Sequence, residues 1–115
     1  MSEQTLGDAI NETRKSIERF KKIEGKPWGV EGAVIELVKQ VGELSSLVVN
    51  KEGYYYNGRE KENSKYNSTK ENIADELADI MFAVVRIADY YAIDLVATNA
   101  ATRLDEDKFL KKQGV

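Results

Sequence analysis

Carboxylates at helical spacing are the residues of this chain that could do chemistry. Glu36, Gln40 and Glu43 lie four and three residues apart, and Glu76 and Asp79 lie three apart. Because each residue of an α-helix advances by about 100°, each set falls on one flank of its own helix. If the two helices pack as an antiparallel pair, the flanks converge, and their carboxylates either take up protons or bind a metal ion.

The residue types that are missing narrow the chemistry of such a site. The chain has no cysteine and no histidine, which excludes thiolate nucleophiles, imidazole bases, disulfides and zinc sites of the Cys/His type. Oxygen ligands alone suit Mg²⁺ or Mn²⁺, and Mg²⁺ held this way reaches for substrate phosphates. The pattern indicates phosphoryl or pyrophosphoryl chemistry with a metal-activated water. The alternative is a solvated surface, because acids at these spacings are common on exposed helix faces.

The composition predicts one packed domain over residues 1–115. Hydrophobic residues make up 42% of the chain and charged residues 32%, a balance typical of a folded protein. The net charge of −3 argues against binding to nucleic acid. No hydrophobic signal region opens the chain and no apolar run approaches the roughly 20 residues of a membrane span, so we expect no membrane partner and a cytoplasmic location.

Four helices are predicted to carry these residues, over about 2–23, 30–50, 69–91 and 95–110. The clearest break is the segment around Pro27, the only proline, which has Gly25 and Gly29 beside it. Ser68 or Thr69 can cap the third helix, and residues 51–67 are predicted to form a long loop. No alternation typical of strands competes with this all-α interpretation.

The apolar periodicity predicts which helix faces form the core. In the second helix, apolar residues alternate spacings of three and four and are expected to pack along one stripe, made of Val34, Leu37, Val41, Leu44 and Val48. In the third helix, Ile73, Leu77, Ile80, Val84, Ile87 and Tyr91 follow the same period. Arg86 shares a flank with Glu76 and Asp79 and is expected to pair with an acid there. Helices this few make a thin core for a monomer, which supports subunit pairing.

Two strings of residues carry a family resemblance. Residues 37–44 read LVKQVGEL and residues 75–80 read DELADI. Together they resemble the MazG-like, all-α nucleoside triphosphate pyrophosphohydrolases, whose signature is E-E-x-x-E on one helix and E-x-x-D on the next. The resemblance covers about residues 28–107. It implies a four-helix subunit, a homodimer or homotetramer, bound Mg²⁺, and cleavage of an NTP or dNTP to the monophosphate and pyrophosphate.

Carried over residue by residue, the resemblance assigns three acids and marks one departure. Glu43, Glu76 and Asp79 match metal ligands and are the implied catalytic residues. The first two glutamates of the family pattern fall on Lys39 and Gln40, and Gln40 offers a neutral carbonyl oxygen where the family has a carboxylate. Glu36, one turn earlier on the same flank, is the candidate to replace it, so the expected metal ligands are Glu36, Gln40, Glu43, Glu76 and Asp79.

Substrate contacts are expected from three further residues. Trp28 could stack on a base, or plug the end of the bundle. Arg103 and Lys108 lie near family positions whose side chains hold phosphates, although such charges also suit a solvated helix face. Three outcomes stay open: an enzyme with a rearranged or weakened metal site, a non-catalytic nucleotide-binding relative, or a helical oligomerisation or adaptor module. The related phosphoribosyl-ATP pyrophosphohydrolases share the fold and differ in substrate.

Overall fold

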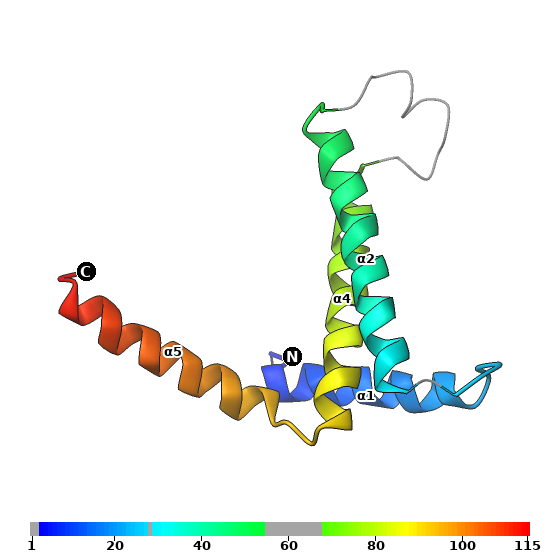
Figure 1. Ribbon diagram of the computed structural model, residues 1–115, viewed down its shortest axis with the longest axis horizontal. Helices are drawn as coiled ribbons and strands as arrows, with labels where there is room; N and C mark the ends of the chain where they lie inside the picture. The colour runs from blue at the N-terminus through cyan, green and yellow to red at the C-terminus, as the bar shows by residue number, and fades with distance from the viewer. Residues whose placement is uncertain (1–2, 28, 55–67) are drawn as a thin grey trace. The chain divides into compact units, whose positions relative to one another are not determined.

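The computed structural model describes residues 3–27, 29–54 and 68–115, and the regular structure within them is entirely helical (Figure 1). The helices are α1 (Leu6–Lys21), α2 (Val30–Lys51), α4 (Lys70–Tyr90) and α5 (Leu95–Lys112). The predicted all-α fold with four helices is therefore confirmed, and no strand occurs in the described part of the chain. Trp28 and most of the predicted loop, residues 55–67, lie outside the described residues.

Local side-chain hydrogen bonds explain where the helices begin. Thr5 and Asp8 form a capping box at α1: Thr5 Oγ1 accepts from the Asp8 amide at 3.0 Å, and the Asp8 carboxylate accepts from the Thr5 amide at 3.1 Å. This motif starts α1 at Leu6, four residues later than predicted. Thr69 caps α4 by accepting from the Asn72 amide at 3.1 Å, and Asp94 caps α5 by accepting from the Ala97 amide at 3.1 Å.

The chain divides into two compact units, and α4 contributes to both. One unit comprises Met1–Glu24 and Val85–Val115, and the other comprises Gly25–Val84. The predicted carboxylates all belong to the second unit, which contains α2 and the first fifteen residues of α4, 70–84.

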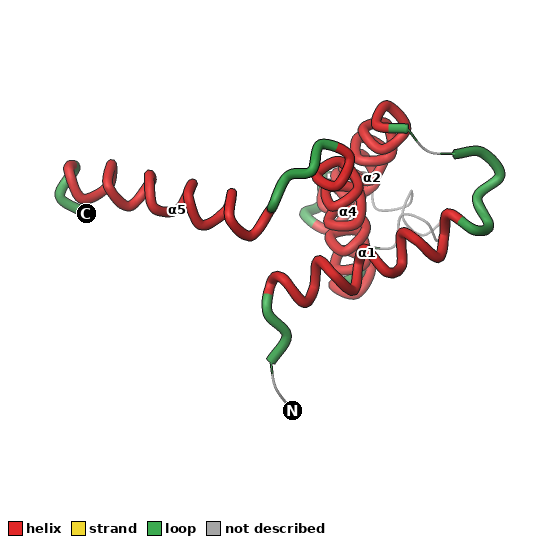
Figure 2. Tube along the Cα trace, turned by 90° about the horizontal axis from the view of Figure 1, so that it is seen from below, coloured by secondary structure: helices red, strands yellow, loops and turns green. Residues whose placement is uncertain are grey.

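In the unit Gly25–Val84, α2 and α4 lie side by side and run in opposite directions (Figures 1 and 2). The residues buried in this unit are Ala33, Gln40, Leu47 and Asn50 on α2 and Ala83 on α4. The predicted core stripe of α2 is wrong in part. Val34, Val41 and Val48 are between 42% and 44% exposed, because the side of α2 that packs in this unit is centred on Gln40 instead.

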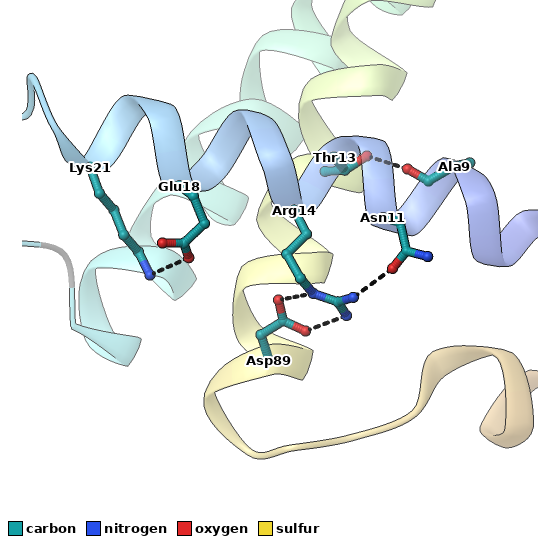
Figure 3. A network of polar contacts seen from close by, with 7 residues as sticks. All are labelled: Ala9, Asn11, Thr13, Arg14, Glu18, Lys21 and Asp89. Carbon is teal, nitrogen blue, oxygen red and sulfur yellow. Dashed lines mark hydrogen bonds and ion pairs between the residues drawn. The ribbon is translucent and has the colours of Figure 1, made fainter.

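In the other unit, α1 packs against the C-terminal end of α4. Ile10 and Ile17 of α1 and Val85 and Ala88 of α4 are its buried apolar residues. The Arg14 guanidinium donates two hydrogen bonds of 2.8 Å to the Asp89 carboxylate and a third of 2.7 Å to Asn11 Oδ1 (Figure 3). Such a bidentate pair fixes the rotation of one helix against the other more firmly than a single contact would.

A second ion pair in the same unit is nearly enclosed. Arg86 of α4 pairs with Glu24, just beyond α1, and their side chains are 9% and 16% exposed. The predicted partner of Arg86 was an acid on the flank of Glu76 and Asp79, so the structure assigns it a partner outside that set. The pair joins positions 62 residues apart in the chain, which local spacing could not reveal.

Helix α5 differs from the other three because none of its residues is buried. It is supported by its Asp94 cap and by pairs along its own surface, Arg103 with Glu106 at 2.8 Å and Lys111 with Asp107 at 3.0 Å. Its apolar side chains Val96, Leu104 and Phe109 are exposed. Among the described helices, none combines the length and the apolar character that crossing a membrane requires.

Candidate carboxylate site

The predicted site lies within one unit, between α2 and α4. α2 contributes Glu36, Gln40 and Glu43, and α4 contributes Glu76 and Asp79. The antiparallel course of the two helices brings Glu43 next to Glu76, close enough for a hydrogen bond between the two carboxyl groups. Charges from Glu43 and Glu36 also act on Asp79. The structure thus groups acids of both helices around Gln40.

Gln40 is the most enclosed residue of the group, with 9% of its surface exposed. Its Nε2 donates a 2.6 Å hydrogen bond to Glu36 Oε1, one turn earlier on α2. Its Oε1 is shielded from solvent and has no hydrogen-bond donor within reach. Glu36 therefore sets the orientation of the amide, and the carbonyl oxygen is left as an unsatisfied acceptor in the interior.

Glu76 provides a second shielded oxygen without a donor, its Oε2. The pKa of Glu76 is raised to about 7, chiefly by burial, and the hydrogen bond with Glu43 and the negative charges of Glu43 and Asp79 contribute to this rise. Lys39 acts in the opposite direction. Burial and neighbouring negative charge both favour the protonated form of a carboxyl group, which is why the pKa of Glu76 is raised.

Asp79 and Lys39 complete the electrostatics of the site. Burial raises the pKa of Asp79, and the charges of Asp75, Glu43 and Glu36 add to this effect. The Lys39 Nζ lies 3.9 Å from Glu43 Oε1 and lowers the pKa values of both Glu76 and Asp79. Lys39 therefore supplies a positive charge at the acidic cluster.

The raised pKa of Glu76 predicts how stability depends on pH. Between about 4.5 and about 7 the folded chain holds a proton that the unfolded chain has released. This group therefore contributes stability that is complete below pH 4.5 and is lost as the pH rises through 7. Glu76→Gln should flatten that part of the pH profile, with the largest gain over wild type at pH 8, in urea unfolding followed by circular dichroism.

The matched control for this pH profile is Glu71→Gln, an exposed acid in the first turn of the same helix. It should retain the wild-type decrease in unfolding free energy between pH 5 and pH 8. Parallel profiles for Glu76→Gln and wild type across this range would contradict the raised pKa of Glu76.

The donor set fits a hard cation, and its composition limits how one could be held. The oxygens of Gln40 and Glu76 are enclosed and unsatisfied, and oxygen is the ligand that Mg²⁺ prefers. Within residues 3–27, 29–54 and 68–115, no three acidic side chains are grouped closely enough to hold an ion by themselves. A cation here would therefore depend on the amide oxygen of Gln40 and on water or phosphate oxygens as well as on the acids.

The three expected substrate contacts lie elsewhere in the chain. Arg103 and Lys108 are exposed on α5, in the unit that does not contain the carboxylates, and Arg103 pairs with Glu106. Trp28 is outside the described residues. No role for any of them is assigned by geometry, and they stay predictions.

A cavity of about 380 Å³ occurs in the same unit as α5 and was not predicted from the sequence. Its polar lining includes Asn11, Arg14, Asp89 and Asp94, and its apolar lining comes from α1, the C-terminal end of α4, the turn after α4 and the start of α5. The hydrogen bonds of Arg14 to Asp89 and Asn11 already engage the cation of this lining. None of the predicted site residues lines the cavity.

Three comparisons with known proteins leave the site to be interpreted from its own chemistry. Protein-family models, curated proteins and solved structures were compared with the chain, and none of them matches.

Proposed function

We propose that the chain is a Mg²⁺-dependent nucleotide pyrophosphohydrolase that converts an NTP or dNTP and water to the monophosphate and pyrophosphate. The proposal rests on the resemblance of residues 37–44 and 75–80 to the MazG-like enzymes and on the oxygens around Gln40. In this proposal Gln40, Glu43, Glu76 and Asp79 bind the metal. The active form is a homo-oligomer in the cytoplasm.

One observation carries the proposal: Gln40 Oε1 and Glu76 Oε2 are enclosed acceptors without donors, in a cluster that also contains Glu43 and Asp79. An unsatisfied buried polar atom costs about 1–3 kcal/mol, and a protein retains such atoms where a ligand satisfies them. Two such oxygens beside acids with raised pKa values are best satisfied together by a cation.

Each side chain of the proposed site has a distinct role. Glu36 holds the Gln40 amide so that its oxygen, and not its nitrogen, is presented. Glu76, whose pKa is raised to about 7, would have to release its proton to bind a cation, so that binding and deprotonation of Glu76 would be coupled. Lys39, beside Glu43, can attract the phosphate tail by its charge. Mg²⁺, when bound, supplies neutralisation of the phosphate charge and a more acidic water.

The direct test measures pyrophosphate release and metal binding on the same preparation. Each common NTP and dNTP, together with phosphoribosyl-ATP, is offered with millimolar Mg²⁺ or Mn²⁺, while calorimetry follows binding of the metal alone. Release from one substrate class with metal dependence supports the proposal and selects the substrate. Absence of release from every nucleotide with either metal would refute the enzyme.

Gln40→Glu tests what the amide costs the proposed site. The new carboxylate would lose the hydrogen bond to Glu36 and face its negative charge, so the metal-free protein should unfold at lower urea concentration. With Mg²⁺ the added charge should tighten metal binding by roughly 10-fold or more and raise the rate of pyrophosphate release. Gln40→Ala is the control, because it removes the same hydrogen bond and adds no ligand. Equal Mg²⁺ affinity in Gln40→Glu and wild type would contradict the assignment of this position to the metal.

The alternative is a helical oligomerisation or adaptor module, and a specific observation favours it. α2 exposes apolar side chains along much of its length, including Val38 at 66%. Such a surface suits a binding partner whether or not the acids hold a metal. Metal binding that persists unchanged after loss of Glu43 and of Asp79 would favour this module over the enzyme.

A further inference from the structure

Lys39 places a positive charge beside the carboxylates of the proposed metal site. Its Nζ lies 3.9 Å from Glu43 Oε1, one turn further along α2. The same charge lowers the pKa values of Glu76 and Asp79 on α4, so it stabilises the deprotonated form of each. A metal ion at these carboxylates would stabilise the same form. Lys39 and a metal ion would therefore compete for the same acids.

The ion pair between Lys39 and Glu43 is weak enough to be exchanged. The two side chains are 61% and 47% exposed, and exposed pairs of this kind contribute little to stability. In a helix the more favourable order puts the acid first and the lysine four residues later. Asp107 and Lys111 of α5 have that order and lie 3.0 Å apart. Lys39 instead precedes its acid and lies further from it, so another anion can replace Glu43 at little cost.

The exposed ammonium of Lys39 leaves the enclosed oxygens of the site unsatisfied. Gln40 is only 9% exposed, and its Oε1 has no donor within reach. The same holds for Glu76 Oε2, although the charge of Lys39 acts on that carboxyl group. Lys39 therefore neutralises the acids from the solvent side. A cation at the enclosed oxygens would repel the ammonium, and the flexible four-carbon stem would let it turn to another anion.

We propose that Lys39 couples metal binding to phosphate binding, because it pairs with Glu43 in the metal-free protein and exchanges Glu43 for a phosphate oxygen when a divalent cation and a phosphate ligand are bound. The inference rests on the proposed function for the identity of the site, and it adds how the two ligands depend on each other. Without phosphate, the ammonium opposes the metal ion by charge repulsion and by engaging Glu43. With phosphate, the ammonium has an anion to neutralise. Each ligand then strengthens binding of the other by the same factor.

The test measures the affinities of two probes by isothermal titration calorimetry. Mg²⁺ is titrated into the metal-free protein. Inorganic pyrophosphate is titrated into the protein at a fixed concentration of free Mg²⁺ that saturates the site. Pyrophosphate is a product of the proposed reaction and is not cleaved in it, so neither measurement depends on turnover or on the choice of base.

Lys39→Met removes the charge and keeps a long unbranched side chain. The variant should bind Mg²⁺ about 3-fold or more tightly than wild type, because a nearby positive charge is gone and Glu43 is free. At saturating Mg²⁺ it should bind pyrophosphate about 10-fold or more weakly, because a charge-assisted contact is lost. Damage to the packing of α2 would weaken both affinities. Changes in opposite directions are therefore specific to the proposed exchange.

Two further variants separate the charge at this position from the net charge of the chain. Lys39→Arg keeps the charge and should hold both affinities within about 3-fold of wild type. Lys15→Met on α1 is the matched control. Lys15 is likewise an exposed lysine that pairs with an acid of its own helix, Glu12 at 3.2 Å. Its loss should change neither affinity.

The outcomes distinguish this inference from the proposed enzyme. Mg²⁺ affinity that is unchanged or weaker in Lys39→Met would overturn the competition for Glu43. Unchanged pyrophosphate affinity in the same variant would overturn the exchange. Either result, with Mg²⁺ binding and metal-dependent release intact in the wild type, would remove this inference and leave the enzyme standing. A wild type that binds no Mg²⁺ would overturn both.

Discussion

Glu43→Ala should abolish detectable Mg²⁺ binding and lower pyrophosphate release by at least about 100-fold. Loss even of residues that only support a metal ligand commonly costs 10- to 100-fold in affinity or activity, and Glu43 is proposed as a ligand itself. Its removal also takes away the hydrogen-bond partner of Glu76 and the acid that pairs with Lys39. Isothermal calorimetry with Mg²⁺ and a pyrophosphate assay measure the two effects on one sample.

The control for Glu43→Ala is Glu18→Ala on α1. Glu18 is likewise a partly exposed helical acid that pairs with a lysine of its own helix, Lys21 at 3.0 Å. It should change neither metal binding nor release. Equal losses in the two variants would indicate a general effect of removing negative charge, and unaltered Mg²⁺ binding in Glu43→Ala would remove the metal from this site.

Arg86→Met should cost about 3–5 kcal/mol of unfolding free energy, the largest effect on stability that we expect. The substitution leaves the Glu24 carboxylate, 16% exposed, without the guanidinium that neutralises it. Because small proteins have only about 5–15 kcal/mol of stability in total, the variant should lose a large share of its folded population on warming. Urea unfolding at pH 7 gives the difference directly.

A second substitution distinguishes the loss of the ion pair from the loss of packing by the aliphatic part of the Arg86 side chain. Adding Glu24→Leu to Arg86→Met removes the stranded charge and should recover part of the loss. Arg103→Ala is the control, since its pair with Glu106 is exposed and should contribute less than about 1 kcal/mol. A loss below 1 kcal/mol in Arg86→Met would show that Glu24 is solvated well enough to need no partner.

The helices could be predicted closely because their signals are local. Pro27 with its two glycines, the Thr69 cap and the three-and-four spacing of apolar residues act within a few positions, so most ends of the helices were predicted within two residues. The exception is the start of α1. There the Thr5–Asp8 capping box decides the boundary, and the periodicity alone extended the helix to the N-terminal side.

For the site and the core, the spacing of residues predicts which side chains share a helix face. It does not predict which faces are buried or how the side chains are oriented. Spacing shows that Val34, Leu37 and Val41 share one side of a helix, but it does not show whether this chain or another one covers them. It places Glu36 one turn from Gln40, but it does not show that the Gln40 amide nitrogen donates to Glu36 and so sets the orientation of the amide group. The pairing of Arg86 with Glu24 depends on the tertiary fold and leaves no local signal.

The continuity of α4 has a thermodynamic consequence for both compact units. Its backbone hydrogen bonds run from Lys70 to Tyr90 without interruption, although the boundary between the units falls between Val84 and Val85. A helix resists local melting in its interior, because opening it there would create two new ends with unsatisfied groups. The boundary is therefore a poor place for the chain to open. The two units should therefore unfold together, in one cooperative thermal transition.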